Sequence, residues 1–192
     1  MSKGANVTPS VALPQGGGAM RGMGEKFSPD LFTGTGNFSV PIAVPVGRNQ
    51  LHPSLSLSYS TGHGNGLYGV GWGLGIPEIT RSTAHGLPIY VDDRDTLVLS
   101  GMEDLVPLPL QSGQPQRYRP RTEGVFANIE HIRTATDNYW KVSTKEGLTS
   151  FYGTPRAHVA SPPSDWQDPA AVRDAVEPNK LYAWKLTRTI DV

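Results

Sequence analysis

The sequence contains no cysteine and carries no net charge. Its 192 residues include 17 Lys and Arg against 17 Asp and Glu. The absence of cysteine excludes disulfide bonds, thiolate metal sites and a cysteine nucleophile. Balanced charge leaves no long-range field that would draw the chain toward nucleic acid or an anionic membrane. We therefore expect no nucleic-acid partner.

Long apolar runs are also missing. Residues 1–25 contain no apolar run of about seven or more, which is the hydrophobic centre that a secretory signal peptide needs. No later run is long enough to span a bilayer. We expect no Sec signal peptide and no membrane insertion by this segment, so export would use another route.

Glycine and proline, by contrast, are abundant. The 22 glycines and 17 prolines make up about a fifth of the chain, which disfavours a helical bundle. Short runs alternate apolar and polar residues, most regularly where Leu55, Leu57 and Tyr59 are separated by serines. This period of two is typical of β-strands, and pairs such as Glu146-Gly147 stand where hairpin turns belong. The sequence predicts an all-β fold of short antiparallel strands.

Residues 66–76 alternate bulky side chains with glycine. Glycine weakens an isolated strand, so a glycine face is expected where another backbone or a large side chain approaches closely. We expect an extended segment with Trp72 buried. The structural motif that we single out consists of Gly69, Gly71, Trp72, Gly73 and Gly75.

The same region contains a dinucleotide-like pattern. Residues 64–69, GNGLYG, match G-x-G-x-x-G, whose glycines bring a pyrophosphate to a helix N-terminus. Alternating glycines follow here instead of a helical pattern. A tight turn is therefore favoured, and we expect no nucleotide or other cofactor.

The histidines show no metal-ligand spacing. They lie 11 or more residues apart, and solvent-facing or turn positions are the favoured interpretation. The five are His52, His63, His85, His131 and His158.

Two acidic clusters offer oxygen ligands for a hard cation such as calcium. They are Asp92, Asp93 and Asp95, and the pair Glu103-Asp104. The glycine and distal glutamate of an EF-hand are not in register with them. Aspartates that form local hydrogen bonds in turns are the favoured interpretation, so no catalytic, cofactor-binding or metal residue is assigned.

Arg117, Arg119 and Arg121 form a basic stripe with Tyr118 opposite. The stripe suits phosphate, but Pro120 and the exposed charge favour an edge strand. Several aromatic residues would suit either a carbohydrate platform or a buried sheet face, and the second is favoured in a strand-rich chain. These are Tyr139, Trp140, Phe151, Tyr152, Tyr182 and Trp184.

Helical periodicity occurs once, in residues 169–178, where Pro169 suits a first turn and Pro178 a stop. This short helix is expected inside an irregular, Pro-rich insertion at residues 154–180. Residues 1–24 are rich in Gly, Pro and Ser and predict a flexible arm. The remaining residues, 25–192, form the β-rich region.

Several segments together carry a resemblance to a known family. They include "GGGAMRGMGEKF", "TGTGNFSVPI", "LSLSYSTGHGNGLYGVGWGL" and "ITRSTAHGLPIY", followed by "LSGMEDLVPL", "YRPRTEGVFANIEH", "YWKVSTKEGLTSFYG" and "YAWKLTRTIDV". In this order they resemble the N-terminal region of the SpvB and TcaC (TcB) family. The resemblance covers nearly all of residues 13–192.

The resemblance implies a structural role. In the TcB branch this region begins the B component of insecticidal toxin complexes, in which B and C components form a hollow β-sheet shell of Rhs/YD type around a toxic C-terminal effector. The B component also docks onto a pore-forming A component. In the SpvB branch the region precedes an ADP-ribosyltransferase domain that modifies actin. We therefore expect a non-catalytic segment of an extracellular virulence protein, made in the bacterial cytoplasm.

Two alternatives belong to other classes. One is a carbohydrate- or protein-binding surface module that uses the aromatic residues. The other is part of an ADP-ribosyltransferase, although the chain contains no E-x-E motif. Because the family continues for many hundreds of residues, we expect a fragment of a longer chain. Its last strand, in residues 180–192, is then expected to lack a partner and to promote self-association.

Overall fold

A computed structural model of the chain describes residues 26–32, 34–47, 52–66, 68–100, 104–122 and 126–191. The predicted arm, residues 1–24, lies outside the described residues. The chain divides into two compact units, Met1–Ile76 and Pro77–Val192. Within the described ranges, no helix combines the length and apolarity needed to cross a membrane.

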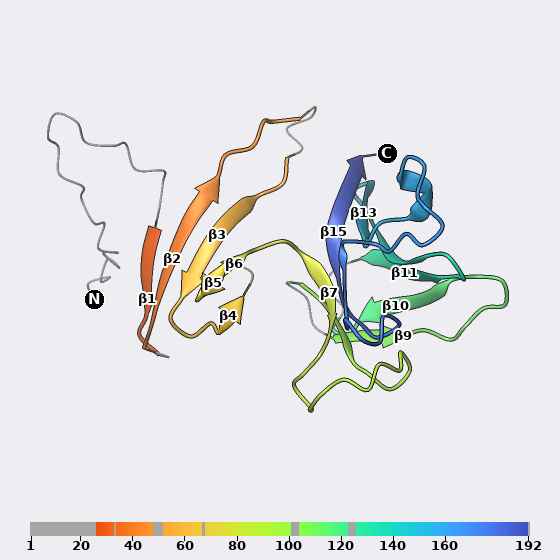
Figure 1. The fold of residues 1–192 in the computed structure, drawn as a ribbon, viewed down its shortest axis with the longest axis horizontal. Coiled ribbons are helices and arrows are strands. Elements are labelled where there is room, and N and C mark those ends of the chain that lie inside the picture. The colour runs from red at the N-terminus through yellow and green to blue at the C-terminus, as the bar shows by residue number, and fades with distance from the viewer. Residues whose placement is uncertain are drawn as a thin grey trace, which may run out of the picture. The chain divides into compact units, whose positions relative to one another are not determined.

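The first unit contains a four-stranded antiparallel sheet of order β1-β2-β3-β6 and a two-stranded pair, β4-β5 (Figure 1). Its strands are β1 (Lys26–Asp30), β2 (Thr35–Ile42), β3 (Leu55–Ser60), β4 (Asn65–Gly66), β5 (Gly69–Val70) and β6 (Trp72–Leu74).

The four-stranded sheet is amphipathic. Cross-strand partners lie on the same face of a sheet, and the register aligns Phe27, Phe38, Tyr59 and Trp72 in one row across β1, β2, β3 and β6. A neighbouring row contains Val40, Leu57 and Leu74. The serines of β3 fall on the opposite face because side chains alternate along a strand. The predicted period-two strand over residues 55–60 is therefore confirmed.

Among its described residues, the second unit contains nine strands and one 3-10 turn. They are β7 (Glu78–Arg81), β8 (Leu97–Leu99), β9 (Asp104–Pro107), β10 (Gln116–Pro120), β11 (Ala127–Arg133), β12 (Asn138–Thr144), β13 (Leu148–Tyr152), η2 (Arg156–His158), β14 (Ala171–Arg173) and β15 (Leu181–Asp191). The β12–β13 hairpin has its turn where Glu146-Gly147 predicted one. The all-β prediction is confirmed.

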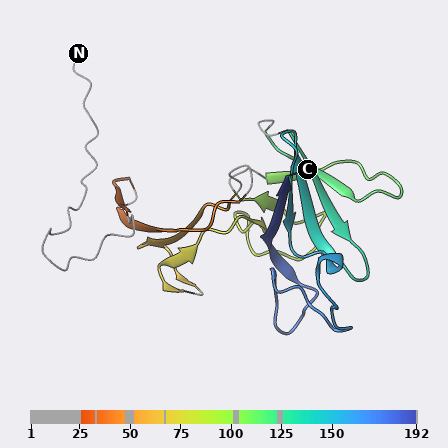
Figure 2. The same cartoon turned by 90° about the horizontal axis from the view of Figure 1, so that it is seen from above.

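Eight of these strands close into a barrel. Neighbouring strands follow the order β13-β12-β11-β10-β9-β8-β7-β15, and an additional β13–β15 pairing closes the ring. Figure 1 shows β7 and β15 side by side, and Figure 2 shows β15, in dark blue, among the green and teal strands of the same unit. β14 pairs with β15 as a ninth strand. Closure removes most open sheet edges.

The prediction of an unpartnered final strand is wrong. The first half of β15 pairs with β7 and β14, and its second half pairs with β13. Trp184 is completely buried. The strand that sequence reasoning left without partners is therefore the one that closes the barrel, and the self-association expected from its edge loses its basis.

Inward-facing residues from strands around the ring fill the barrel. The largest completely buried side chains are those of Ile79, Leu97, Leu99, Ile129, Trp140 and Trp184. The two indoles pack edge to face, with ring centroids 5.8 Å apart. Such interdigitated side chains make the barrel interior a packed core rather than a channel.

The helix predicted at residues 169–178 is wrong. Ala171–Arg173 form β14 instead, and Ala171 pairs with Trp184 of β15. The side chain of Asp168 accepts the N–H of Ala170, and that of Asp174 accepts the N–H groups of Val176 and Glu177. Such local bonds compete with helix formation. The insertion does contain one short helix, the 3-10 turn η2.

Candidate functional site

The glycine-rich segment is not the single extended strand that its alternation predicted. Turns at Tyr68 and Gly71 break it into β5 and β6, because Gly69 and Gly71 adopt left-handed backbone angles, with φ of 98° and 81°. Only glycine adopts this region without strain. As a result the bulky residues do not share one buried face: Val70 is 68% exposed and Trp72 is half-buried.

The close approach lies at Gly71. A Cβ built there would lie 2.4 Å from the ring of Tyr59 and 3.0 Å from the carbonyl oxygen of Ser60. Gly69 and Gly75 have open space around them, and Gly73 has only Ser58 Oγ at 4.0 Å. The geometry therefore makes Gly71 the residue of the motif that cannot change.

Replacing Gly71 by Val is expected to destabilise the first unit by about 1–3 kcal/mol, because the side chain overpacks Tyr59. Hydrogen exchange of the β2 and β3 amides measures the effect. Gly75→Ala is the matched control, since its Cβ meets nothing within 4 Å. Equal exchange in the two variants would contradict the argument.

The dinucleotide-like pattern forms a hairpin. Gly66 of β4 pairs with Gly69 of β5, and no helix follows in the described residues up to Glu78. In the dinucleotide fingerprint, the glycines bring the pyrophosphate to the N-terminus of a helix that directly follows. The predicted tight turn is confirmed.

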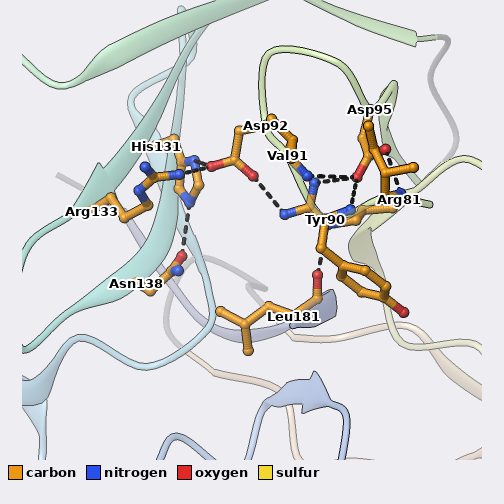
Figure 3. Close-up of polar contacts among 10 residues, drawn as sticks. Arg81, Tyr90, Val91, Asp92, Asp95, His131, Arg133, Asn138 and Leu181 are labelled. Atoms are coloured by element: carbon orange, nitrogen blue, oxygen red, sulfur yellow. Dashed lines mark hydrogen bonds and ion pairs between the residues drawn. The ribbon is translucent and has the colours of Figure 1, made fainter. Parts of the chain in front are cut away.

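The most developed polar cluster lies in the second unit around the buried guanidinium of Arg81, which is 4% exposed (Figure 3). Arg81 Nε donates to the carbonyl oxygen of Leu181 at 2.7 Å. Its Nη1 and Nη2 donate to Asp95 at 2.9 Å and Asp92 at 2.5 Å. Three of the five Arg donors thereby join β7, β15 and the loop of residues 82–96.

Asp95 organises that loop. Its carboxylate accepts the backbone N–H groups of Ile89, Tyr90 and Val91 as well as the Arg81 donor. Tyr90 adopts a left-handed angle, φ 62°, which these bonds offset. The sequence interpretation of the acidic cluster as a turn former is confirmed for Asp95.

Asp92 lies between two cations and a histidine, as Figure 3 shows. Arg81 binds one of its oxygens, and the other pairs with Arg133 and lies 3.8 Å from His131 Nδ1. Burial pushes the pKa of Asp92 up. The hydrogen bond from Arg81 and the charges of His131, Arg81 and Arg133 outweigh burial and hold it below its ordinary value.

His131 is a core residue, unlike the other four histidines, which are exposed. Its ring stacks on Trp140 with centroids 4.1 Å apart, and Nε2 bonds to Asn138 Oδ1 at 2.8 Å. Desolvation lowers the pKa of His131 to about 4. The ring is therefore neutral at pH 7, and the prediction of a solvent-facing or turn position is wrong here.

An open cleft of about 570 Å³ lies over this network. Asp92, Asp93, Tyr118, His131 and Arg133 line it, together with the loop between β9 and β10. Burial and the nearby Asp92 charge raise the pKa of Tyr118 to about 12, so its phenol stays protonated. Among the ionised groups that line the cleft, all except Asp93 already form ion pairs in the network. These ion pairs hold the loop of residues 82–96 against the barrel.

No group of three or more potential metal ligands forms within the described ranges. Asp92 and Asp95 are occupied by Arg81, whereas Asp93 is exposed. Asp104 pairs with Arg121 at 3.3 Å, and Glu103 lies outside the described residues. The predicted acidic clusters are thus not brought together.

The basic stripe lies on the outer face of the barrel. Arg117, Arg119 and Arg121 are exposed and Tyr118 is buried, as the alternation predicted. The edge-strand interpretation is wrong, because β10 lies between β9 and β11. Pro120 is tolerated since it is the last residue of β10, beyond the positions paired with β11.

The aromatic residues mostly fill the core, as predicted. Trp140, Phe151, Tyr152 and Trp184 are buried, and Tyr139 and Tyr182 are half-buried. They do not form an exposed platform.

Sequence reasoning missed Arg81 and the His131–Asn138 pair. For both, the period-two pattern of the strand indicated an inward-facing position. Arg81 falls two residues after Ile79, and His131 two residues after Ile129, so each shares the inward face of its strand.

The structure thus combines an amphipathic sheet with a closed barrel, and comparison with known proteins shows to which family such a chain belongs. The profile of the SpvB family, described as Salmonella virulence plasmid 65kDa B protein, matches residues 30–192. The chain belongs to this family.

Individual relatives agree. The chain is 32% identical over 179 residues to the mono(ADP-ribosyl)transferase SpvB of Salmonella choleraesuis (strain SC-B67), covering 83% of this chain and 29% of the relative. The same identity and coverage are found with the SpvB of Salmonella enteritidis. The chain therefore spans less than a third of these relatives.

Solved structures show the same fold. A chain of the TcdB2-TccC3 crystal structure matches with a TM-score of 0.67 and 27% identity, over 95% of this chain and 9% of that one. The N-terminal domain of the effector SpvB from Salmonella typhimurium strain LT2 matches with a TM-score of 0.58 and 26% identity, over 79% of this chain and 50% of that one. A chain of the Photorhabdus luminescens Tc holotoxin pore matches with a TM-score of 0.65 and 26% identity, over 95% of this chain and 8% of that one.

Proposed function

We propose that this chain is a non-catalytic structural segment of an extracellular bacterial toxin or virulence protein, and that it contributes strands to a β-sheet shell that encloses a C-terminal toxic effector. Its partners are then the remaining shell sequence and C component, and the pore-forming A component onto which such a shell docks. The family, and the fit to TcdB2-TccC3 over 95% of the chain, support this role.

The uncovered apolar face of the first unit carries the proposal. Phe38, Val40, Leu57, Tyr59 and Trp72 share that face, yet none of them is buried. Phe27 and Ile42, on the same face, are 46% and 41% exposed. All the buried hydrophobic residues of the described chain belong to the second unit. An apolar face of this size marks a surface that another layer covers.

The remaining sequence of a longer chain is the proposed cover. The curated relatives are about three times longer than the part that matches, since it makes up 29% of their length. β1 also has a strand neighbour on one side only among the described residues. A following strand of the shell would pair there and bury Phe27.

Fragment complementation tests this role. The 192-residue chain is mixed with a TcdB2-TccC3 assembly from which the matching segment has been deleted, and the relative's own segment serves as the positive control. We expect the chain to be retained and the β1 and β2 amides to exchange at least about tenfold more slowly. Phe27→Asp should abolish retention, whereas Ser56→Asp, on the polar face, should not. Failure of the chain where the control segment succeeds would contradict the proposal.

The transferase activity in the relatives' name is proposed to lie outside this segment. The chain contains no E-x-E motif, and the carboxylates of Asp92 and Asp95 are already paired with arginines. Incubation with NAD⁺ and actin should give no nicotinamide release. Release above the rate measured without the chain would favour an enzyme.

A further inference from the structure

A second, smaller cleft lies on the second unit and is independent of the proposed shell role. It has a volume of about 240 Å³ and is bounded by the turn of residues 134–138, the loop of residues 154–168 and the loop of residues 173–181. Its lining is mostly polar. The side chains that matter here are Asn138, Trp166, Gln167, Asp168, Arg173 and Asn179.

Asp168 is the fixed point of this cleft. It is 8% exposed, and each carboxylate oxygen accepts one backbone N–H, from Thr154 at 2.7 Å and from Ala170 at 3.0 Å. No cation pairs with this carboxylate anywhere in the described chain. A buried carboxylate has room for further donors and gains from them, because burial without compensation is costly. Asp168 is therefore a buried carboxylate, held in place by the backbone, that can accept further hydrogen bonds from a ligand in the cleft.

Donors stand around this acceptor. Gln167 and Asn179 are exposed, and their amides form no hydrogen bond within the described part of the chain. Arg173 Nη2 donates to the backbone oxygen of Asp168 at 3.2 Å, which holds its guanidinium at the cleft. Amide groups both donate and accept, so a ligand rich in hydroxyls would meet both kinds of partner.

Trp166 adds an apolar surface that is held in place. It is half-buried, and the guanidinium carbon of Arg156 lies 5.9 Å from the centroid of its ring. Arg156 is in turn fixed by donating to the carbonyl oxygen of Pro163 at 2.7 Å. The guanidinium covers one face of the ring, so the opposite face is the one proposed to receive C–H groups, at little entropic cost because the ring is already held.

Charge and size select the ligand. An anion would face the carboxylates of Asp137 and Asp168, and a cation would face Arg173. The volume lies below the roughly 300–1,000 Å³ of sites for drug-sized ligands, so about one ring fits. We propose that this cleft binds a single neutral pyranose unit of a glycan, with hydroxyls on Asp168, Gln167 and Asn179 and the C–H face of the ring on Trp166.

Titration of the full chain with single sugars tests the proposal. The probes are glucose, galactose, mannose, N-acetylglucosamine and N-acetylgalactosamine, and the indole N–H of Trp166 is observed by nuclear magnetic resonance. At least one sugar should shift this signal saturably, with a dissociation constant on the order of 1–10 mM. Absence of a saturable shift for all five would overturn the proposal.

Two variants locate the binding. Gln167→Ala should weaken binding by about tenfold, which is the loss expected for one hydrogen bond to the ligand. Trp166→Leu, whose binding is followed by the backbone N–H signal of Thr154 because the indole is gone, should weaken it by at least as much. Gln111→Ala is the matched control, because Gln111 is also exposed and lies outside the cleft. Unchanged affinity in the cleft variants, or an equal response to glycerol or phosphate, would overturn the assignment.

Discussion

Replacing Arg81 by Met should lower the free energy of unfolding of the second unit by about 3–5 kcal/mol, the cost of removing one partner from a buried ion pair. The reason is that Arg81 compensates two largely buried carboxylates and a carbonyl oxygen. Met fills much of the volume but leaves Asp92 with Arg133 alone and removes the charged donor from Asp95. The carbonyl of Leu181 also loses its partner. Urea unfolding followed by tryptophan fluorescence measures the loss.

Two further variants separate charge from geometry. Arg81→Lys keeps the charge, but its donors all sit on one nitrogen and cannot reproduce the planar fork that reaches Leu181, Asp92 and Asp95, so it should recover only part of the stability. Arg94→Met removes an exposed arginine of the same loop and should change stability by less than about 0.5 kcal/mol. If Arg81→Met proved as mild as Arg94→Met, the network would not be what holds the loop.

A local measurement distinguishes this mechanism from general destabilisation. The amides of Ile89, Tyr90 and Val91 donate to Asp95, which Arg81 holds in place. In Arg81→Met they should exchange faster even under conditions where the β11 and β12 amides remain protected. Uniform exchange across the unit would mean that the loop is not a separate opening unit.

Local pattern was enough to predict several strands of this chain. Serine alternation in residues 54–60 and the Glu146-Gly147 turn each specify backbone geometry through neighbours close in sequence. Pairing over long separations was beyond that reach. The barrel closes by pairing β7 with β15, which lies about a hundred residues later in the sequence. Neither strand has a sequence pattern that would identify the other as its partner.

The two errors in local structure have local causes. In residues 169–178 a helical pattern lost to aspartate hydrogen bonds and to the pairing of Ala171 with β15. At Gly71 the alternating pattern predicted extension, but two left-handed glycines turn the chain. Period alone does not tell a glycine that packs against a neighbour from one that reverses direction.

The candidate site shows the same division. The acidic loop was visible in the sequence as a turn, and Asp95 performs that role. The sequence did not reveal which cations pair with the aspartates of this loop. Arg81 pairs with Asp95 and Arg133 pairs with Asp92, and these arginines come from strands that only the barrel brings together. The protonation state of His131 depends on the same closure, since burial against Trp140 and Trp184 in the barrel desolvates its ring.

That desolvation makes stability depend on pH. The pKa of His131 is about 4 in the folded chain, against an ordinary 6.5. Between these values the unfolded chain binds the proton and the folded chain does not, so the free energy of unfolding rises with pH in this window. Acidification from pH 7 to pH 4 should therefore remove about 3 kcal/mol, at 1.36 kcal/mol for each unit of pKa difference.

The groups around the ring set where this loss occurs. Burial lowers the pKa of His131 most. The hydrogen bond that His131 Nε2 donates to Asn138 Oδ1 and the charge of Asp92 raise it, and the charges of Arg133 and Arg81 lower it further. Asp92 itself titrates below its ordinary value of 3.8, so it adds its own loss only at more acid pH. The window from about pH 6.5 to pH 4 thus belongs to His131 among these groups.

His131→Phe should flatten the pH dependence in that window. The phenyl ring keeps an aromatic surface between Trp140 and Trp184 but binds no proton. Urea unfolding at pH 7, 6, 5 and 4.5 gives the slope for each protein, and the variant, although less stable at pH 7, should approach the parent as the pH falls. His85→Phe, at an exposed histidine, should retain the parent's slope. Parallel slopes for His131→Phe and the parent would show that protonation of this ring does not govern the acid lability of the barrel.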